Sequence, residues 1–309
     1  MHKTRLVGLA VFCCFVGCLA AAAKPKPASP ADAKIPSWAK VSKAQIAEAK
    51  KLGVPVAFEN ASGLKFVLAP AGEFMMGSPD DEPGSYKEEK PQHKVKIRKA
   101  FYISIHQTTQ GQWRALMGTK PWLGKASTKD DPLNAVTNVC WNDAMAFCAK
   151  LGKKDGGSYG LPSEAQWEYA CRAGTTTRYC YGDDPEAKKL GQYAWYLDAG
   201  WNIESERHTH HVGVKKPNNW GVHDMHGNVW ELCADAQHSN FEGAPSDDRP
   251  WMKGSVPNKD GALARVLRGG GLRSTDRRTR SASRYSYPQT ASSYYVGFRV
   301  SCALPAKAK

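Results

Sequence analysis

The stretch Gly221–Asp235, with the sequence GVHDMHGNVWELCAD, constrains the fold of this chain more than any other segment. Two carboxylates, Asp224 and Glu231, flank a tight Gly227-Asn228 turn, so side-chain oxygens and free backbone carbonyls lie within a few residues of one another. Hard cations such as Ca²⁺ bind oxygen-rich arrangements of this kind. In a second interpretation, Glu231 accepts hydrogen bonds from backbone N–H groups and the turn holds no metal. The residues alone leave both interpretations open.

The chain after Gly182 contains few long or periodic segments, although it runs for more than 100 residues. Such a span is unusual inside a compact domain. We therefore expect loops that are held by buried tryptophans, by disulfides or by metal ions.

Regular elements are predicted mainly before Gly182, from alternating apolar residues for strands and from apolar periodicity with capping residues for helices. The predicted strands cover residues 64–69 and 95–105. The predicted helices cover residues 43–52 (capped by Ser42), 109–117 (capped by Thr108 or Thr109), 141–151 (with Asn142 near the start) and 163–172 (from Ser163).

The segment 1–23 is typical of an export signal, with a basic start, an apolar run over residues 6–19 and a small-residue cleavage site at Ala21–Ala23. Alternatively, Phe15–Cys18 is a lipoprotein signal, in which Cys18 would carry a lipid. A third alternative is an uncleaved anchor. All three place the remaining chain outside the cytoplasm, in the periplasm, at the cell surface or in the medium.

The rest of the chain divides into three parts. Residues 24–53 form a Pro/Ala/Lys-rich linker followed by the short helix, residues 54–304 form one large domain, and residues 305–309 form a basic tail. The formal net charge of +14 resides largely at the ends, since residues 24–53 hold seven lysines against two acids. The domain itself has an ordinary charge, and nucleic acid is therefore not an expected partner of an exported protein.

Eight motifs follow one another along the domain. They are Pro70–Ser78 (PAGEFMMGS), Glu89–Val95 (EKPQHKV), Thr108–Trp113 (TTQGQW), Val139–Cys148 (VCWNDAMAFC), Leu161–Gly174 (LPSEAQWEYACRAG), Lys216–Glu231 (KPNNWGVHDMHGNVWE), Arg268–Gly271 (RGGG) and Gly297–Arg299 (GFR). In this order they resemble the formylglycine-generating enzyme family, also called the sulfatase-modifying factor domain. The resemblance runs from about Val54 to Cys302. It implies an α+β fold, a variant of the C-type-lectin fold that is low in regular secondary structure.

The resemblance also implies a calcium site at the opening motif. Carried over by position, Asp224 and Glu231 would supply side-chain oxygens, and Gly227 and Val229 would supply backbone carbonyls. We therefore expect Ca²⁺ as a cofactor.

Six cysteines follow the signal segment, and export makes disulfides permissible. Cys148 with Cys302 resembles a bridge of the family. Ser281 stands where some members have a cysteine bonded to the counterpart of Cys171. The remaining candidate pairs are Cys171 with Cys180 and Cys140 with Cys233.

Active members of the family carry two cysteines between RGGS and a downstream arginine-rich strand. These thiolates bind Cu(I), which prefers soft ligands, and the copper activates O₂ to oxidise a sulfatase cysteine to formylglycine. In this chain the corresponding stretch is Gly271–Arg284, and residues 234–301 contain no cysteine. Ser274 falls at the first cysteine position and the region Asp276–Thr279 at the second. Since hydroxyl and carboxylate oxygens cannot replace thiolates on Cu(I), we expect neither copper nor a catalytic residue here.

The same stretch is rich in arginine and adjoins several tyrosines, residue types that are favoured at recognition surfaces. The binding candidates are Arg273, Arg277, Arg284, Tyr285 and Tyr287. In the opposing interpretation, these arginines pair with buried carboxylates such as Glu164, Glu168 or Glu231.

Two functions of different classes follow. The missing cysteines favour an exported, non-catalytic module that binds a peptide or glycan ligand outside the cytoplasm. The alternative is a formylglycine-generating oxidase. In a third hypothesis, the protein is a structural component of the envelope whose only membrane contact is a lipid on Cys18.

Overall fold

The computed structural model describes residues 34–199, 204–255, 257, 261 and 263–305. The predicted export signal, Cys18 and nearly all of the basic tail lie outside the described residues. In the described part of the chain, no helix is both long enough and apolar enough to cross a bilayer.

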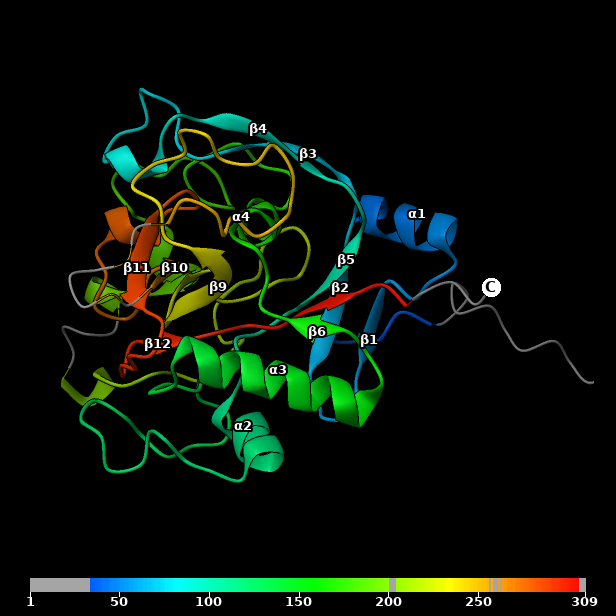
Figure 1. The fold of residues 1–309 in the computed structure, drawn as a ribbon, viewed down its shortest axis with the longest axis vertical. Coiled ribbons are helices and arrows are strands. Elements are labelled where there is room, and N and C mark those ends of the chain that lie inside the picture. The colour runs from blue at the N-terminus through cyan, green and yellow to red at the C-terminus, as the bar shows by residue number, and fades with distance from the viewer. Residues whose placement is uncertain (1–33, 200–203, 256, 258–260, 262, 306–309) are drawn as a thin grey trace, which may run out of the picture.

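An antiparallel sheet with the strand order β1-β2-β5-β13-β6 forms the half of the molecule on the right of Figure 1. Its strands are β1 (Ala57–Glu59), β2 (Lys65–Ala69), β5 (Phe101–Ser104), β13 (Ser301–Ala303) and β6 (Tyr159–Gly160). Val67 pairs with Ala57 on one side and with Ile103 on the other. Phe66, Leu68 and Ile103 are fully buried, so removal of apolar surface from water stabilises the centre of this sheet.

A second sheet has the order β11-β10-β9-β12, with β9 antiparallel to β10 and parallel to β12. Its strands are β9 (Trp230–Ala236), β10 (Ala264–Arg268), β11 (Arg284–Pro288) and β12 (Val296–Gly297). Two small ribbons complete the strands: β3 (Gly72–Met76) with β4 (His93–Ile97), and β7 (Ala194–Trp195) with β8 (His226–Gly227). The expectation of few regular elements after Gly182 thus misses a sheet. Buried charged residues, such as Glu231 and Arg268, interrupt the apolar pattern from which a strand is predicted.

The described residues form four α-helices, which pack around the sheets (Figure 1). They are α1 (Lys43–Leu52), α2 (Gln110–Met117), α3 (Trp141–Asp155) and α4 (Glu164–Arg172), and short 3₁₀ turns cover Lys87–Glu89, Leu190–Gln192, Leu197–Ala199, Glu204–Glu206 and Asp276–Thr279. The caps Ser42 and Thr109 are confirmed, and Ser163, predicted as the first helical residue, is the N-cap of α4; each cap is reciprocated by a glutamine three residues later. Helix α3 begins at Trp141, as predicted, with Cys140 at its N-cap position, but it runs to Asp155 rather than ending at Leu151. The predicted strand 95–105 is divided, because β4 ends at Ile97 and β5 begins at Phe101.

Helix α1 packs on the domain. Its Gln45 side chain is fully buried, and Nε2 donates to the carbonyl oxygens of Leu68 at 2.9 Å and Trp220 at 3.3 Å. The short helix after the predicted linker is therefore part of the packed body.

Buried arginine–glutamate pairs cross the interior of the domain. The pairs are Arg280–Glu89 at 2.6 Å, Arg284–Glu164 at 2.5 Å, Arg299–Glu231 at 2.6 Å, Arg172–Glu168 at 2.9 Å and Arg268–Glu168. Fully buried ions are tolerated only when they are paired and hydrogen-bonded. These pairs hold segments together in addition to the buried tryptophans that the sequence predicted, such as Trp167 and Trp230.

Candidate functional site

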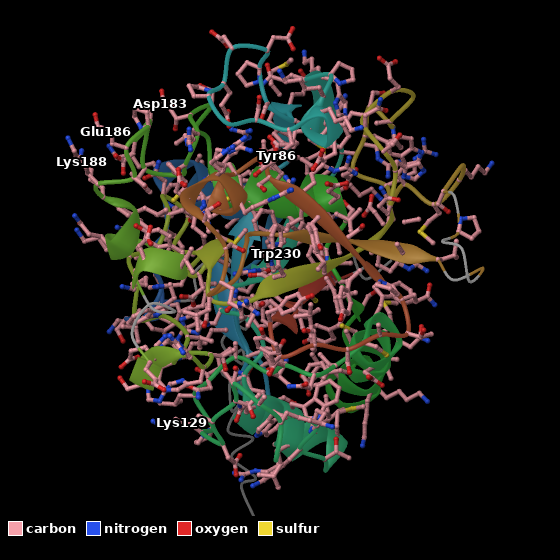
Figure 2. The ribbon with its side chains drawn as sticks, turned by 90° about the vertical axis from the view of Figure 1, so that its left-hand side faces the viewer. Tyr86, Lys129, Asp183, Glu186, Lys188 and Trp230 are labelled. Carbon is pink, nitrogen blue, oxygen red and sulfur yellow. The ribbon has the colours of Figure 1, made fainter. Side chains whose placement is uncertain are left out.

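A pocket of about 360 Å³ opens beside Ser274. It lies between the loop that follows β10 and the start of β11, and Figure 2 looks onto this face, with Trp230 labelled near its centre. The lining residues are Trp230, Gly271, Arg273, Ser274, Thr275, Arg278, Tyr285 and Tyr295. The pocket therefore forms where the resemblance places the catalytic cysteines.

Aromatic rings form the walls of the pocket. The ring centroids of Trp230 and Tyr285 are 5.4 Å apart, and Tyr295 contacts Tyr287 edge-on at 5.9 Å and Tyr294 at 5.3 Å. Tyr285 is 46% exposed, whereas Trp230 is 6% exposed. One ring is thus anchored in the core and the other faces solvent, an arrangement that suits recognition of a ligand.

The floor of the pocket is a tight turn at Ser274. Its hydroxyl accepts a hydrogen bond from the N–H of Gly271 at 2.9 Å, and its own N–H donates to the Gly271 carbonyl at 2.8 Å. Asp276 Oδ2 is paired with Arg178 Nη2 at 3.0 Å. The atoms that could bind a metal at the two predicted cysteine positions are therefore oxygens, and these oxygens already have hydrogen-bond or ion-pair partners. They do not fit Cu(I), which requires soft thiolate ligands.

The predicted binding residues separate into two groups. Arg273 and Tyr285 line the pocket, whereas Tyr287 is outside the lining and contacts the lining residue Tyr295. Arg277 lies outside the lining, with its guanidinium carbon 5.0 Å from the centre of the Tyr86 ring.

Arg284 is a correction to the set of binding candidates. It is buried and holds Glu164 through Nε at 2.5 Å and Nη2 at 2.8 Å, as the opposing interpretation expects. Sequence reasoning missed Trp230 in the lining, whereas Arg278 belongs to the arginine-rich stretch and Tyr295 to the tyrosines that adjoin it. Trp230 could have been identified from the GNVWE motif. Side chains alternate along a strand, so the Trp230 side chain points to the opposite face from those of Val229 and Glu231.

The four predicted calcium residues meet at one point inside the domain. The Nε2 atom of Gln107 lies 3.2 Å from each of the carbonyl oxygens of Asp224, Gly227 and Val229, and 2.9 Å from Oε1 of Glu231. We call these four oxygens the oxygen cage. Asp224 contributes its backbone carbonyl to the cage rather than its carboxylate, which accepts the N–H of Gly213 at 2.7 Å through Oδ2. Burial raises the pKa of the Asp224 carboxyl to about 6.

The oxygen cage as packed does not fit a calcium ion beside Gln107. Calcium–oxygen distances are about 2.3–2.6 Å, and the ion would need the position that the Gln107 nitrogen holds. Glu231 is also engaged by Arg299, through Nε at 2.6 Å and Nη2 at 2.7 Å, and by Trp167 Nε1 at 2.7 Å. An ion could enter only by displacing the amide, so calcium binding stays a prediction that requires a measurement.

The described cysteines are all free, so none of the three expected disulfides is formed in the structure. Burial raises the pKa of Cys148 and Cys171 to about 12 and that of Cys302 to about 11. Buried thiols with raised pKa values pack as small apolar groups. Cys171 and Cys180 nevertheless border the same imidazole. The sulfur of Cys171 lies 3.9 Å from His226 Nε2, which accepts the Cys180 N–H at 3.2 Å.

Comparisons with known proteins agree with the order of the motifs. The family model for the sulfatase-modifying factor enzyme 1-like domain matches residues 52–304. The formylglycine-generating enzyme of Streptomyces coelicolor is 33% identical over 190 residues, which are 58% of this chain and 56% of that enzyme, so the match spans just over half of that relative. The Bos taurus protein named inactive C-alpha-formylglycine-generating enzyme 2 is 25% identical over 291 residues, covering 78% of this chain and 88% of that protein.

The fold is shared with a solved structure. PvdO from Pseudomonas aeruginosa superposes with a TM-score of 0.72 at 32% identity, covering 80% of this chain and 98% of that one. The mixed helices and strands described above are consistent with the expected α+β variant of the C-type-lectin fold. The chain belongs to the family of sulfatase-modifying factor enzyme 1-like domains.

Proposed function

We propose that this protein is a non-catalytic binding module of its family, which recognises a peptide or glycan through the pocket beside Ser274. The observation that carries the proposal is the lining itself, which combines three aromatic rings with two guanidinium groups and contains no thiol. The existence of a relative whose name marks it as inactive supports a family role without oxidation.

The chemistry of the lining favours a ligand with a flat apolar face and a negative group. Tyr285 and Trp230 offer ring faces for stacking, and Arg273 and Arg278 offer N–H donors on cationic groups. Part of that charge is already balanced, since Arg278 Nη1 lies 3.3 Å from Glu88 Oε1. A weakly acidic peptide or glycan suits this site better than a polyanion.

We also propose that the module acts outside the cytoplasm. Residues 1–23 have the pattern of an export signal, so the ligand would be met outside the cytoplasm. Fractionation of cells that express the full chain, together with fatty-acid labelling of the wild type and Cys18→Ser, tests the location and the lipid. Recovery of the full-length protein in the cytoplasm would contradict this part.

The oxidase alternative is tested with the purified protein, Cu(I), O₂ and a Cys-x-Pro-x-Arg peptide. Mass spectrometry should find the peptide cysteine intact, while the Streptomyces coelicolor enzyme serves as a positive control. Conversion of the cysteine to formylglycine that depends on this protein would overturn the non-catalytic proposal.

Binding is tested by calorimetric titration of acidic, neutral and basic peptides and of neutral and acidic oligosaccharides. We expect saturable binding of an acidic ligand that weakens in Tyr285→Ala. The matched control is Arg114→Ala, since Arg114 is exposed on α2, outside the pocket lining. If every ligand that binds does so equally well to Tyr285→Ala, the pocket is not the binding site.

A further inference from the structure

The amide of Gln107 is surrounded by more acceptors than it has protons. A primary amide carries two N–H bonds, yet Nε2 faces four oxygens at 2.9–3.2 Å. Three of these oxygens are backbone carbonyls from one short loop, and the fourth belongs to a carboxylate. Convergence of oxygens on a single point is the arrangement that a hard cation requires. Here the partly positive NH₂ group occupies that point.

The hydrogen-bond network fixes which end of the amide faces the oxygen cage. Oε1 of Gln107 accepts a hydrogen bond from Nδ2 of Asn228 at 2.9 Å, and Oδ1 of Asn228 in turn accepts the N–H of His210 at 2.9 Å. Reversal of the Gln107 amide would place its oxygen against four other oxygens and its nitrogen against a donor. Only the orientation with Nε2 in the cage satisfies both ends.

The charge at the oxygen cage is already balanced without an ion. Glu231 is fully buried, and so is Arg299, which holds it with two hydrogen bonds. A divalent cation inserted beside this pair would add positive charge next to the guanidinium, which weakens cation binding but does not abolish it. A neutral amide adds hydrogen bonds and leaves the charge of the site unchanged.

The backbone of the loop is shaped to present its carbonyls inward. Asp224 and Asn228 have φ angles of +58° and +64°, a region that costs energy for residues other than glycine and persists only where the surroundings hold it. At Gly227, a Cβ atom would meet the carbonyl oxygen of Trp195 at 2.1 Å. Such a loop needs a partner at its centre, and Gln107 supplies one from the segment before α2.

We infer that the side-chain amide of Gln107 replaces a bound cation in this domain, so that the loop Asp224–Glu231 holds its shape without calcium. The inference concerns the interior of the fold and is independent of the ligand proposed for the pocket. It also identifies the residue that decides between a metal-dependent and a metal-independent loop.

The first test uses the full chain purified in metal-free buffer. Elemental analysis should find no calcium at one equivalent, and the melting temperature should be the same with EDTA and with millimolar Ca²⁺. One equivalent of bound calcium, or a melting temperature that falls with EDTA, would overturn the inference and establish the calcium cofactor instead.

The second test exchanges one atom. Gln107→Glu places an oxygen where the nitrogen stands, so the oxygen cage would contain five oxygens and no donor. We expect a lower melting temperature in EDTA and a recovery of several degrees in Ca²⁺, because an ion that binds only the native state stabilises it. The matched control is Gln45→Glu, which places a carboxylate against two carbonyls outside the cage. It should lose stability without recovery in Ca²⁺.

A third variant keeps the inference testable if Gln107→Glu does not fold. Gln107→Ala opens the oxygen cage without adding a charge, and its melting temperature should fall and then partly recover in Ca²⁺. Recovery in either Gln107 variant but not in Gln45→Glu supports the inference. Absence of recovery in both Gln107 variants would show that the oxygens do not form a cation-shaped site, and would overturn it.

Discussion

The oxygen cage and the pocket beside Ser274 are built on the same strand and differ in how their polar groups are paired. Along β9 and the residue before it, Val229 and Glu231 serve the cage, while the ring of Trp230 between them lines the pocket. Alternation of side chains along a strand separates the two sites. In the cage, every oxygen contacts Gln107 and the charge of Glu231 is matched by Arg299. In the pocket, the Tyr285 ring and the Arg273 side chain are exposed to solvent.

This difference distinguishes a structural site, the oxygen cage, from the pocket that we propose as the recognition site. Polar groups that are fully paired and buried fix a single conformation, and removing one partner is costly. Rings and cations that keep exposed surface can exchange water for a ligand. Both sites lie where the resemblance implies a metal ion, and each is now occupied or lined by side chains of the protein itself.

The largest expected effect is on the cage side. Arg299→Met leaves Glu231 buried without its cationic partner, and the free energy of unfolding should fall by about 4 kcal/mol. Urea denaturation measures the change. The control is Arg249→Met, because Arg249 is an exposed partner of Asp247, and it should change stability by less than about 0.5 kcal/mol. Equal effects of the two substitutions would remove the distinction between buried and exposed pairs.

The His106 side chain, next to Gln107 in the chain, should make a contribution to stability that is lost in acid. Burial, with His223 and Arg299 nearby, lowers the pKa of His106 to about 3, below its value of about 6.5 in an unfolded chain. The unfolded state therefore takes the proton first, so stability is complete above pH ~6.5 and falls towards pH ~3 by up to about 1.4 kcal/mol per pH unit. In His106→Leu this slope should be smaller, as measured by urea denaturation at several pH values. An unchanged slope would contradict the assignment.

A smaller effect is expected in the pocket. Tyr285→Ala removes an exposed ring, so affinity for a bound peptide or glycan should fall by about 1–2 kcal/mol, while stability changes by less than about 0.5 kcal/mol. Tyr285→Phe should keep most of the affinity, because it retains the ring face. Calorimetry and urea denaturation separate the two quantities. A large loss of stability with unchanged affinity would place Tyr285 with the structural residues.

The smallest effect is expected for Arg273, at the rim of the pocket. Its Nη1 donates to the Tyr294 hydroxyl at 2.5 Å, but the side chain remains exposed. Arg273→Ala should weaken an acidic ligand by about 0.5–1 kcal/mol, and the difference should shrink as salt is raised. A loss that does not depend on salt would assign Arg273 a packing role.

Local signals in the sequence predicted local structure well. The caps at Ser42, Thr109 and Ser163 each depend on a glutamine three residues away, which is close enough for a short sequence motif to include both residues. The GNVWE motif marked the residues of the oxygen cage, and the missing thiols marked Ser274. The order of the motifs identified the family and its α+β fold.

The remaining features depend on partners that are distant in the chain. Gln107 lies 117 positions from Asp224, and nothing in its own surroundings distinguishes it from a surface glutamine. Arg280 and Arg284 look like solvated charges in a basic stretch, yet each meets a buried glutamate more than 100 positions away. Sequence patterns assign polar residues to the surface, whereas this fold uses them inside its second half.

We propose that the Gln107 amide takes the place of the calcium ion that the family resemblance implies, and that the turn at Ser274 does not bind the copper ion. The most direct test is elemental analysis of the folded protein after exposure to Ca²⁺ and Cu(I) and removal of free metal by gel filtration. We predict that neither metal is retained at one equivalent per chain. One equivalent of either calcium or copper in the purified protein would contradict the claim.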